Sequence, residues 1–434
     1  MAREGIYFEK LNFPHSGTAQ KPIVFTRYLD EIVIVDATKV PFTEGIFVRV
    51  IGKSYINISG IRFQNFLGRT LVSKGLAIIG PSVGVQILNN EFQDFGPVDD
   101  EGELDGIAVF SHKGQHVSDV RISGNKFVRI ATGYSEVVML NGFVHEFEVS
   151  DNEVTDAATN PILAASGGYD IKDWGGGYST DSLGIPHHGV FRNNYIHDNR
   201  RGKGTNGIYI DGGRDIIIEN NRIINNVVGI GAGCEERRAK KSSNIIIRNN
   251  VLVNNSYGIW NGNSENFGGR RVPGGVDSLF IYSNTIVNGE GGLLLFEKSP
   301  AADIFVYNNI FYRRADQVGK PIINANNSDI PNFVLDHNLY WTGEASNPKV
   351  FVYGGKTYRS LTEFAAATGN EKNGLSADPL FENLPSQNFE LKSGSPAIDA
   401  GIALDKVPTD SKGIKRPTGL KPDIGAYEMK KEVK

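Results

Sequence analysis

Residues 207–221 read GIYIDGGRDIIIENN, and this stretch decides the fold. Two strand-like segments flank an Asp-Gly-Gly turn, and the stretch ends in two asparagines. A closely related stretch follows at residues 229–250, GIGAGCEERRAKKSSNIIIRNN. Alternating apolar positions with β-branched residues are typical of half-buried strands, and self-similarity over so short a distance indicates a repeat of stacked coils.

The same unit recurs along the chain, and the second asparagine of its closing pair marks most copies. The marker residues are Asn90, Asn125, Asn152, Asn194, Asn221, Asn250, Asn284, Asn309 and Asn338. Stacked strands lie about 4.8 Å apart, so these residues are expected to form a column in which each side chain hydrogen-bonds to its neighbours. Asparagine also tolerates the left-handed backbone that a sharp corner needs. We therefore interpret the column as structural.

A single coil of this kind cannot bury its own apolar face, whereas stacked coils bury a continuous core. The sequence therefore predicts an all-β fold, a parallel β-helix. A β-propeller would need nearly constant blades of four strands, and the irregular spacing of the repeat disfavours it. We expect the β-helix with its inserted loops to cover residues 1–342. Residues 343–434 are expected to form a C-terminal cap on the last coils, because an open coil exposes strand edges.

The composition excludes several classes of protein. The chain has 434 residues and a net charge of −4, without the basic field of a nucleic-acid-binding protein. Its one cysteine, Cys234, allows no intrachain disulfide. No apolar run reaches the roughly 18 residues that a membrane span needs. The chain begins without a signal peptide, and we expect a secreted or extracytoplasmic protein whose leader is not part of this sequence. The oligomeric state cannot be read from it.

Several motifs resemble those of bacterial right-handed parallel β-helix proteins that act on polysaccharides. They are NGIYIDGG, IIIENNRI and GIGAGCE in the central coils, with SGSPAIDAG at 393–401 and PDIGAYE at 422–428. The central run is similar to glycoside hydrolase family 120, the β-xylosidases. This resemblance implies a retaining mechanism, with Asp211 as nucleophile and Glu235 as acid/base. The chain departs from the family pattern around this glutamate, since Cys234 precedes it and a second acid, Glu236, follows it.

The residues themselves also favour a carboxylate pair. Counted from the glycine that opens each strand, Asp211 is four residues on and Glu235 is six. Even offsets place both side chains on the same face of a sheet. One coil apart and two residues along, their backbones would be about 8 Å apart. Side chains can adjust that gap to the about 5–5.5 Å of a retaining or the about 6.5–9.5 Å of an inverting glycosidase, so the stereochemistry stays open. Asp-Gly is also a common turn dipeptide, which is the structural alternative.

Further candidates for substrate binding lie in the inserted loops and on neighbouring coils. They are Lys172, Asp173, Trp174, His187, His188, Glu236, Trp260 and Asn263. Trp174 stands in a glycine-rich polar insertion, which suits a platform for sugar stacking. Trp260 either lines a subsite or faces the core. The histidines contact substrate or are solvated loop residues.

The loop at 98–106, VDDEGELDG, holds five acids within seven residues. Closely spaced carboxylates can bind Ca²⁺, but this loop does not match the twelve-residue calcium-loop pattern, so a solvated acidic loop is the preferred interpretation. No cofactor is required by the predicted chemistry, and Ca²⁺ remains an option.

The sequence thus predicts a glycoside hydrolase that acts on plant-type oligo- or polysaccharides, with xylan-derived substrates favoured. A polysaccharide lyase is the runner-up. It would need a Lys or Arg base and Ca²⁺ or arginine to neutralise a uronate. A non-catalytic carbohydrate-binding or adhesin-like β-helix is the third alternative, because one fold hosts many functions. Neither a nucleic acid nor a membrane is an expected partner.

Overall fold

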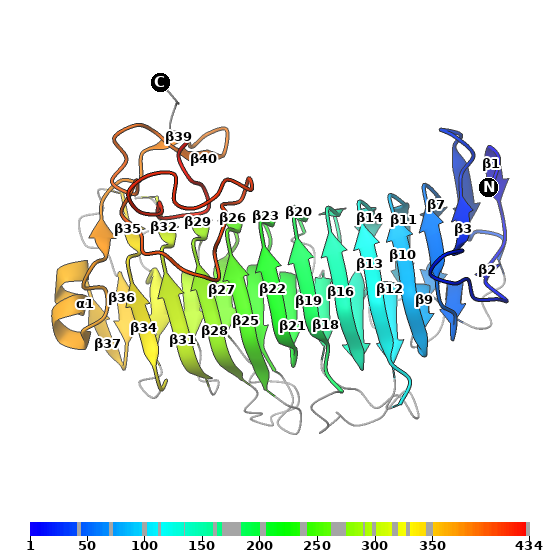
Figure 1. The fold of residues 1–434 in the computed structure, drawn as a ribbon, viewed down its shortest axis with the longest axis horizontal. Coiled ribbons are helices and arrows are strands. Elements are labelled where there is room, and N and C mark those ends of the chain that lie inside the picture. Colours follow the sequence, from blue (N-terminus) through cyan, green and yellow to red (C-terminus); the bar gives the residue numbers. More distant parts are fainter. Residues whose placement is uncertain are drawn as a thin grey trace. The chain divides into compact units, whose positions relative to one another are not determined.

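The computed structural model describes most of the chain (Figure 1). The residues outside the description are 41–44, 69–72, 98–101, 112–113, 134, 159–162, 167–183, 200–204, 235–240, 262–274, 290, 297–300, 315–319, 327–329, 344–349 and 431–434. The chain divides into two compact units. The first comprises residues 1–216 and 234–242, and the second comprises 217–233 and 243–434.

Each coil of the first unit contributes one strand to each of three parallel sheets, named A, B and C. The A strands are β1 (Gly5–Tyr7), β4 (Val33–Asp36), β7 (Arg62–Gln64), β11 (Glu91–Pro97), β14 (Lys126–Ile130), β17 (Glu153–Thr155) and β20 (Tyr195–His197), with β8 (Leu67–Gly68) beside β11. The B strands are β3 (Ile23–Thr26), β6 (Ile56–Ser59), β10 (Ser82–Leu88), β13 (Val117–Ser123), β16 (Val144–Ser150) and β19 (His187–Arg192), and β22 (Arg214–Glu219) begins in this unit. The C strands are β2 (Leu11–Asn12), β5 (Ile46–Ile51), β9 (Ser73–Ile79), β12 (Leu104–Ser111), β15 (Val138–Gly142), β18 (Leu163–Ser166) and β21 (Asn206–Asp211).

The second unit repeats this arrangement. Its A strands are β23 (Arg222–Ile224), β26 (Val251–Val253), β29 (Thr285–Val287), β32 (Ile310–Tyr312), β35 (Leu339–Trp341) and β38 (Leu375–Ser376). Its B strands are β25 (Ser242–Arg248, of which 243–248 belong here), β28 (Val276–Tyr282), β31 (Ala301–Tyr307) and β34 (Phe333–Asp336). Its C strands are β24 (Val228–Gly233), β27 (Tyr257–Asn261), β30 (Gly292–Phe296), β33 (Ile323–Ala325) and β36 (Phe351–Tyr353), and the antiparallel β37 (Lys356–Tyr358) closes this sheet.

The sequence therefore folds as a right-handed parallel β-helix, as predicted. In β13 the apolar side chains of Val117, Val120 and Ile122 are buried, while Asp119 and Arg121 are exposed, which is the expected alternation. Equivalent residues stack on successive coils. Phe92 pairs in register with Phe63 and Phe127, and its ring stacks on theirs at 5.2 and 5.0 Å. Such columns bury the apolar face that no single coil could bury alone.

The predicted asparagine column is confirmed within each unit. In the first unit the backbone N–H of Asn125 and its side-chain amide both donate to Oδ1 of Asn152, at 2.9 and 3.0 Å. The same pattern links the first unit's members from Asn90 to Asn194 and the second unit's members from Asn221 to Asn338. The expected backbone strain lies elsewhere: the residue before the marker adopts the left-handed conformation, as at Asn220 with φ 56°. The marker asparagine and the residue before it therefore divide the two roles.

A buried carboxyl ends the column in the second unit. Glu371 accepts hydrogen bonds from the Asn338 side-chain amide at 2.7 Å and from the Tyr340 hydroxyl at 2.6 Å. Burial raises the pKa of Glu371 to about 7, although the bonds from Tyr340 and Asn338 oppose the shift. Near neutral pH the folded protein therefore holds a proton that an unfolded chain would release.

This proton makes stability depend on pH in a defined direction. Between the ordinary value of 4.5 and about 7, the folded state binds more protons at Glu371 than the unfolded state does. The free energy of unfolding should therefore fall as pH rises through that window, by about 3 kcal/mol in total. Glu371→Gln is neutral at every pH and should remove this part of the slope. Urea unfolding of both proteins from pH 4.5 to 7.5 measures it, with the exposed Glu382→Gln as control. Equal slopes in wild type and Glu371→Gln would contradict the assignment.

The residues after β36 form two segments, of which the first packs on the C strands and the second on the A strands. The strand β37 is followed by the helix α1 (Leu361–Thr368), which starts at the Ser360 N-cap and ends at Gly369 with φ 77°. The ring of Phe364 in α1 stacks on Phe351 at 4.2 Å, so this segment covers the last C strands. Among the described residues no helix is long and apolar enough to cross a membrane.

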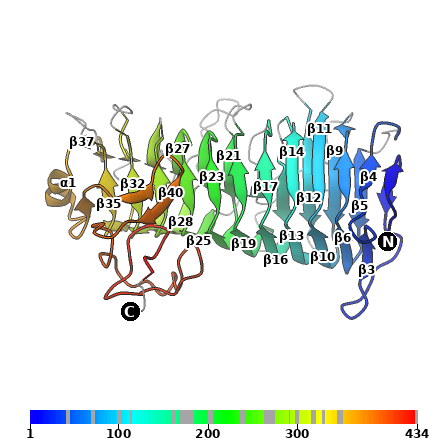
Figure 2. The same cartoon turned by 90° about the horizontal axis from the view of Figure 1, so that it is seen from above.

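The remaining tail lies along the A strands of the second unit. It forms the hairpin β39 (Phe381–Asn383) and β40 (Asn388–Leu391) and then a long irregular segment. Its apolar residues pack along the A strands of the second unit, from Ile224 in β23 to Leu339 in β35. Figure 2 shows the hairpin beside β32 and β35. The tail thus covers a flank. The boundary at 342/343 stays a prediction, since β36 and β38 continue the sheets beyond it.

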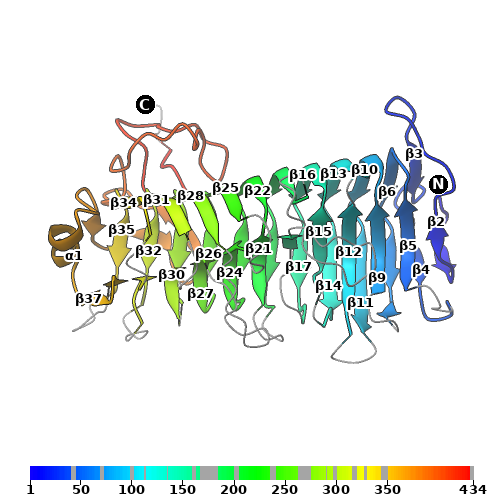
Figure 3. The same cartoon turned by 90° about the horizontal axis from the view of Figure 1, so that it is seen from below.

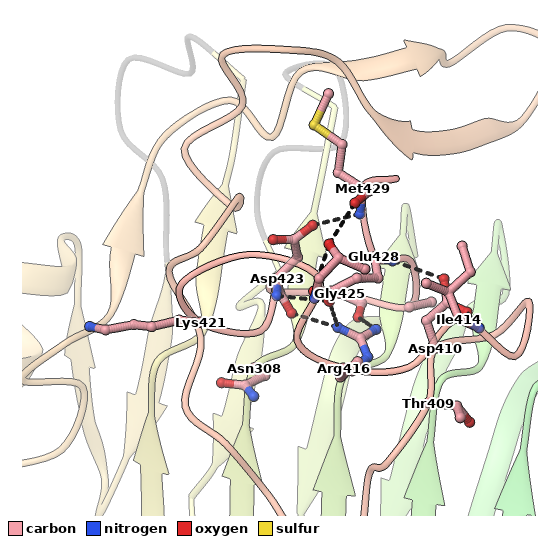
Figure 4. A network of polar contacts seen from close by, with 12 residues as sticks. Asn308, Thr409, Asp410, Ile414, Arg416, Lys421, Asp423, Gly425, Glu428 and Met429 are labelled. Atoms are coloured by element: carbon pink, nitrogen blue, oxygen red, sulfur yellow. Dashed lines mark hydrogen bonds and ion pairs between the residues drawn. The ribbon is translucent and has the colours of Figure 1, made fainter. Parts of the chain in front are cut away.

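A buried polar network organises this tail (Figure 4). Arg416 donates to Oε2 of Glu428 at 3.0 Å and to the backbone oxygens of Asp423 and Gly425 at 2.8 and 2.7 Å. The network is attached to the coils, since the Asn308 side chain exchanges two hydrogen bonds with the Ile402 backbone. The motifs SGSPAIDAG and PDIGAYE are therefore parts of one flank-covering structure.

Candidate functional site

Asp211 ends β21 in the C sheet of the first unit, where the Asp-Gly-Gly turn leads to the next strand. The N–H groups of Gly212 and Gly213 donate to Oγ of Ser242 at 3.0 and 3.2 Å, which fixes the turn. Gly212 has φ 83°, a conformation that favours glycine. A Cβ on Gly213 would lie 2.6 Å from Cδ1 of Ile216, so this glycine serves close packing of the turn on the core.

The Asp211 side chain belongs to the outer face of the C sheet. It is in register with Ser166, which pairs in turn with Asn141, and that residue with Phe110. The preceding position in these strands carries core residues, such as Val109 and Ile210, which are fully buried. Phe110 instead packs with Ala108 and Met139 in a small cluster separate from the main core. Figure 3 shows β9, β12 and β15 of this sheet side by side.

A cluster of charged side chains lies at the opposite ends of the same strands. Lys74 opens β9 and forms an ion pair with Asp105 of β12, its partner in register, and both side chains are at most 1% exposed. Ser135 donates to Oδ1 of Asp105 and contacts Glu136 at 3.2 Å. The Lys74 ammonium lies 4.8 Å from the centre of the Phe110 ring, which places the cluster beside the outer face. We call Lys74, Asp105, Ser135 and Glu136 the basal cluster.

Electrostatics give Glu136 a distinct state. Burial, then the charge of Asp105 and, more weakly, that of Asp211 raise the pKa of Glu136 well above its usual range. The ammonium of Lys74 neutralises the carboxylate of Asp105, and Glu136 is a second acid beside this ion pair. Its side chain nevertheless keeps partial exposure to solvent. A carboxyl whose pKa is raised and whose side chain is still accessible can donate a proton to a ligand.

The predicted histidines lie beside the turn that follows Asp211. His187 and His188 begin β19, and the backbone N–H of Arg214 donates to the oxygen of Pro186 at 3.0 Å. The ring of His187 stacks on His145 at 5.2 Å. Burial first, then the charge of Arg214, lowers the pKa of His187 to about 4, so this ring is neutral at pH 7. His188 is exposed on the same strand.

Trp260 lies in the second unit, on β27. It is in register with Gly231 and Leu295, while its neighbour Ile259 is fully buried in the core, so the indole belongs to the outer face. The indole is half-buried, and its Nε1 has no hydrogen-bond partner among the described residues. The alternation therefore excludes the core interpretation of Trp260 and leaves the subsite interpretation as a prediction.

Other predicted site residues lie outside the described part of the chain. These are Glu235, Glu236, Lys172, Asp173, Trp174 and Asn263. The acidic stretch 98–106 is described only from Gly102 onwards, and there Asp105 is fully buried in the basal cluster, so it is not part of a solvated loop. Within the described residues, no group of three or more His, Cys, Asp or Glu side chains could hold a metal ion.

The basal cluster was not predicted from the sequence, although the sequence contains a signal for it. SKGLAII at 73–79, LDGIAVF at 104–110 and SEVVML at 135–140 each place a charged residue just before the apolar run of a C strand. The structure aligns these runs in register, and the charged residues Lys74, Asp105 and Glu136 come together at their start.

Comparison with known proteins agrees with the observed fold. Residues 118–332 match the family described as periplasmic copper-binding protein NosD. The tailspike of E. coli bacteriophage HK620, solved in complex with a hexasaccharide, is similar with a TM-score of 0.50 and 9% identity over 76% of this chain and 66% of the tailspike. Pectate lyase Pel9A gives a TM-score of 0.49 and 12% identity over 99% and 98% of the two chains.

One relative is similar in sequence over nearly its whole length. The protein YwoF of Bacillus subtilis (strain 168) is 30% identical over 409 residues, which cover 92% of this chain and 84% of YwoF. This identity exceeds that of the structural neighbours and includes both units described above. The chain therefore belongs to the YwoF family, with a parallel β-helix fold.

Proposed function

We propose that this protein is a carbohydrate-active enzyme, a glycoside hydrolase that uses carboxyl groups on the outer face of the C sheet. The observation that carries the proposal is Glu136, a partly exposed carboxyl whose pKa is raised by burial, by the charge of Asp105 and, more weakly, by that of Asp211. One acid held in its protonated form near a second carboxylate is the arrangement that glycosidases use to protonate a leaving group while stabilising the sugar cation.

In this mechanism Asp211 attacks the anomeric carbon and the acid protonates the glycosidic oxygen, then activates water. The family 120 resemblance implies Glu235 as that acid, and Glu136 is the described residue whose raised pKa suits the same role. His187, neutral and next to the turn after Asp211, can accept or donate a hydrogen bond to a sugar hydroxyl. Xylan-derived oligosaccharides are the favoured substrates because of the resemblance, and a retaining outcome follows from it as well.

A polysaccharide lyase is the second candidate, since lysine often serves as its base. The described lysine at this face is Lys74, which is engaged in a buried ion pair with Asp105 and is 1% exposed. A lysine that is buried in an ion pair does not reach a substrate, which favours the hydrolase. A tailspike with the same fold binds a hexasaccharide, so the fold can hold oligosaccharides without specifying the chemistry. We place the activity outside the cytoplasm, as the match to a periplasmic family suggests.

The test separates the three functions in one experiment. The protein is incubated with an aryl β-xyloside, xylo-oligosaccharides and polygalacturonate, the last with and without Ca²⁺. We expect new reducing ends without the ultraviolet absorbance of an unsaturated product, which identifies hydrolysis. New absorbance would identify a lyase and overturn the proposal. Binding without either product would leave only a carbohydrate-binding protein.

A further inference from the structure

A cavity of about 760 Å³ lies in the second unit, between the ends of the A strands and the hairpin β39–β40. Its walls include Val253 and Val287 at the strand ends and Phe389 of the hairpin. Ligand pockets for small molecules have about 300–1,000 Å³, so this one has an adequate size. It involves neither Asp211 nor the basal cluster, and the tail creates it by covering the flank of the coils.

The cavity has an aromatic wall that is fixed in place. Tyr312 and Trp341 are neighbours in register on β32 and β35. The ring of Tyr312 also contacts Phe381 of the hairpin at 5.5 Å. Trp341 and Tyr312 are both half-buried, so each keeps a part of its surface open to the cavity. Rigid aromatic rings of this kind offer an apolar surface for the face of a sugar.

The polar wall is also held in a defined orientation. The Asn288 amide donates to Oδ1 of Asn254 at 3.1 Å, and Oδ1 of Asn288 accepts the backbone N–H of Arg314 at 3.2 Å. On the hairpin side, Gln387 accepts a hydrogen bond from Arg222 at 2.7 Å. Amides that are already oriented lose little entropy when they bind a hydroxyl group.

The charge of the wall selects the kind of sugar. Among the described residues that line the cavity, Arg314 is the only one with a charged side chain, and it is exposed. A guanidinium binds a carboxylate in two parallel hydrogen bonds, and both the charge and the geometry discriminate against neutral ligands.

We propose that this cavity is a second, non-catalytic binding site for an acidic oligosaccharide. A sugar ring stacks on Trp341, the asparagine and glutamine amides bind its hydroxyls, and Arg314 pairs with the carboxylate of a uronic acid unit. The site goes beyond the proposed hydrolase activity, because it would hold polymer through residues other than the catalytic ones. It also does not require that activity.

Calorimetric titration with trigalacturonate and with xylotriose tests the site, using the Asp211→Asn variant so that little substrate is consumed. We expect trigalacturonate to bind more tightly than xylotriose. Arg314→Gln should weaken trigalacturonate at least about tenfold and leave xylotriose nearly unchanged, since a charge-assisted hydrogen bond contributes about 1.5–3 kcal/mol. Trp341→Ala should weaken both sugars.

Matched controls are Tyr195→Ala, an exposed aromatic on β20 of the first unit, and the exposed Lys372→Gln. Neither should change the affinity, and thermal unfolding verifies that each variant is folded. If neither sugar binds, or if Arg314→Gln and Trp341→Ala both bind trigalacturonate as tightly as the parent does, the proposal is wrong. If both sugars bind equally and Arg314→Gln changes neither affinity, the assignment to acidic sugars is wrong. Hydrolase activity in the wild type is measured separately, so a failure of one proposal is distinct from a failure of the other.

Discussion

Asp211→Asn is expected to lower kcat on an aryl β-xyloside by a factor of about 10² or more, because the amide cannot act as the nucleophile. The substitution keeps the size of the side chain, and the Gly212 and Gly213 amides, which donate to Ser242, hold the turn. The fold should therefore be unchanged, and the loss should appear in kcat. Asp119→Asn, an exposed aspartate on β13 with a left-handed backbone that asparagine also tolerates, is the matched control.

The pH profile connects this variant to the proton donor. The charge of Asp211 contributes to the raised pKa of Glu136, so its removal should lower that pKa. If Glu136 is the general acid, the alkaline limb of kcat/KM belongs to loss of its proton, and this limb should move to lower pH in any residual activity of Asp211→Asn. Glu136→Gln should abolish the limb.

Glu235→Gln distinguishes the two candidate acids. If Glu235 donates the proton, as the family 120 resemblance implies, Glu235→Gln should lose about 10² or more in rate on a substrate with a poor leaving group. In that case Glu136→Gln should change the pH profile but not the maximal rate. Full activity in all three variants would move the catalytic site away from this face.

Arg416→Met is expected to reduce the free energy of unfolding of the second unit by about 3–5 kcal/mol, because it leaves the buried Glu428 carboxylate without its counter-charge. Both side chains of the pair are at most 2% exposed, and Arg416 also binds the Asp423 and Gly425 carbonyls. Loss of the arginine therefore removes the centre of the network that holds SGSPAIDAG and PDIGAYE together.

An exposed ion pair in the same tail provides the control. Lys412 and Glu390 contact each other with side chains 48% and 44% exposed, and Lys412→Met should cost about 1 kcal/mol or less. Urea unfolding measures both variants. Limited proteolysis should cleave Arg416→Met in the tail before the coils. Arg416→Lys keeps the charge but loses the planar fork, so an intermediate loss is expected. A cost for Arg416→Met as small as that of Lys412→Met would show that the network does not hold the tail.

The repeat, the asparagine column and the position of Asp211 on an outer face could be predicted, because each depends on local alternation and on equivalent positions in successive coils. The basal cluster could not, because it depends on the register between C strands that are separated by loops of unequal length. A shift of one residue would have turned Lys74 or Glu136 to the other face. The sequence shows a charged residue before each apolar run, but it does not show which of these residues lie next to one another in the fold.

The sequence predicts that the tail covers the last coils, because the last coil would otherwise expose its strand edges. That argument does not specify which surface the tail covers. Phe389 and Leu391 pack on the A strands of earlier coils, where strands such as β26 and β29 leave apolar side chains outside the main core. The cavity lined by Trp341 exists only because the tail lies on this flank, so no pattern in the sequence indicates it without the fold.

The asparagine column has a consequence for how such proteins diversify. Successive members are separated by 27 residues between Asn125 and Asn152 but by 42 between Asn152 and Asn194, and the hydrogen bonds are the same. One corner of every coil is therefore held to a fixed length, while the other corners absorb all insertions. Loops can then be lengthened, exchanged or deleted at those corners without shifting the rows of side chains on the C sheet, which makes the scaffold suitable for loop grafting.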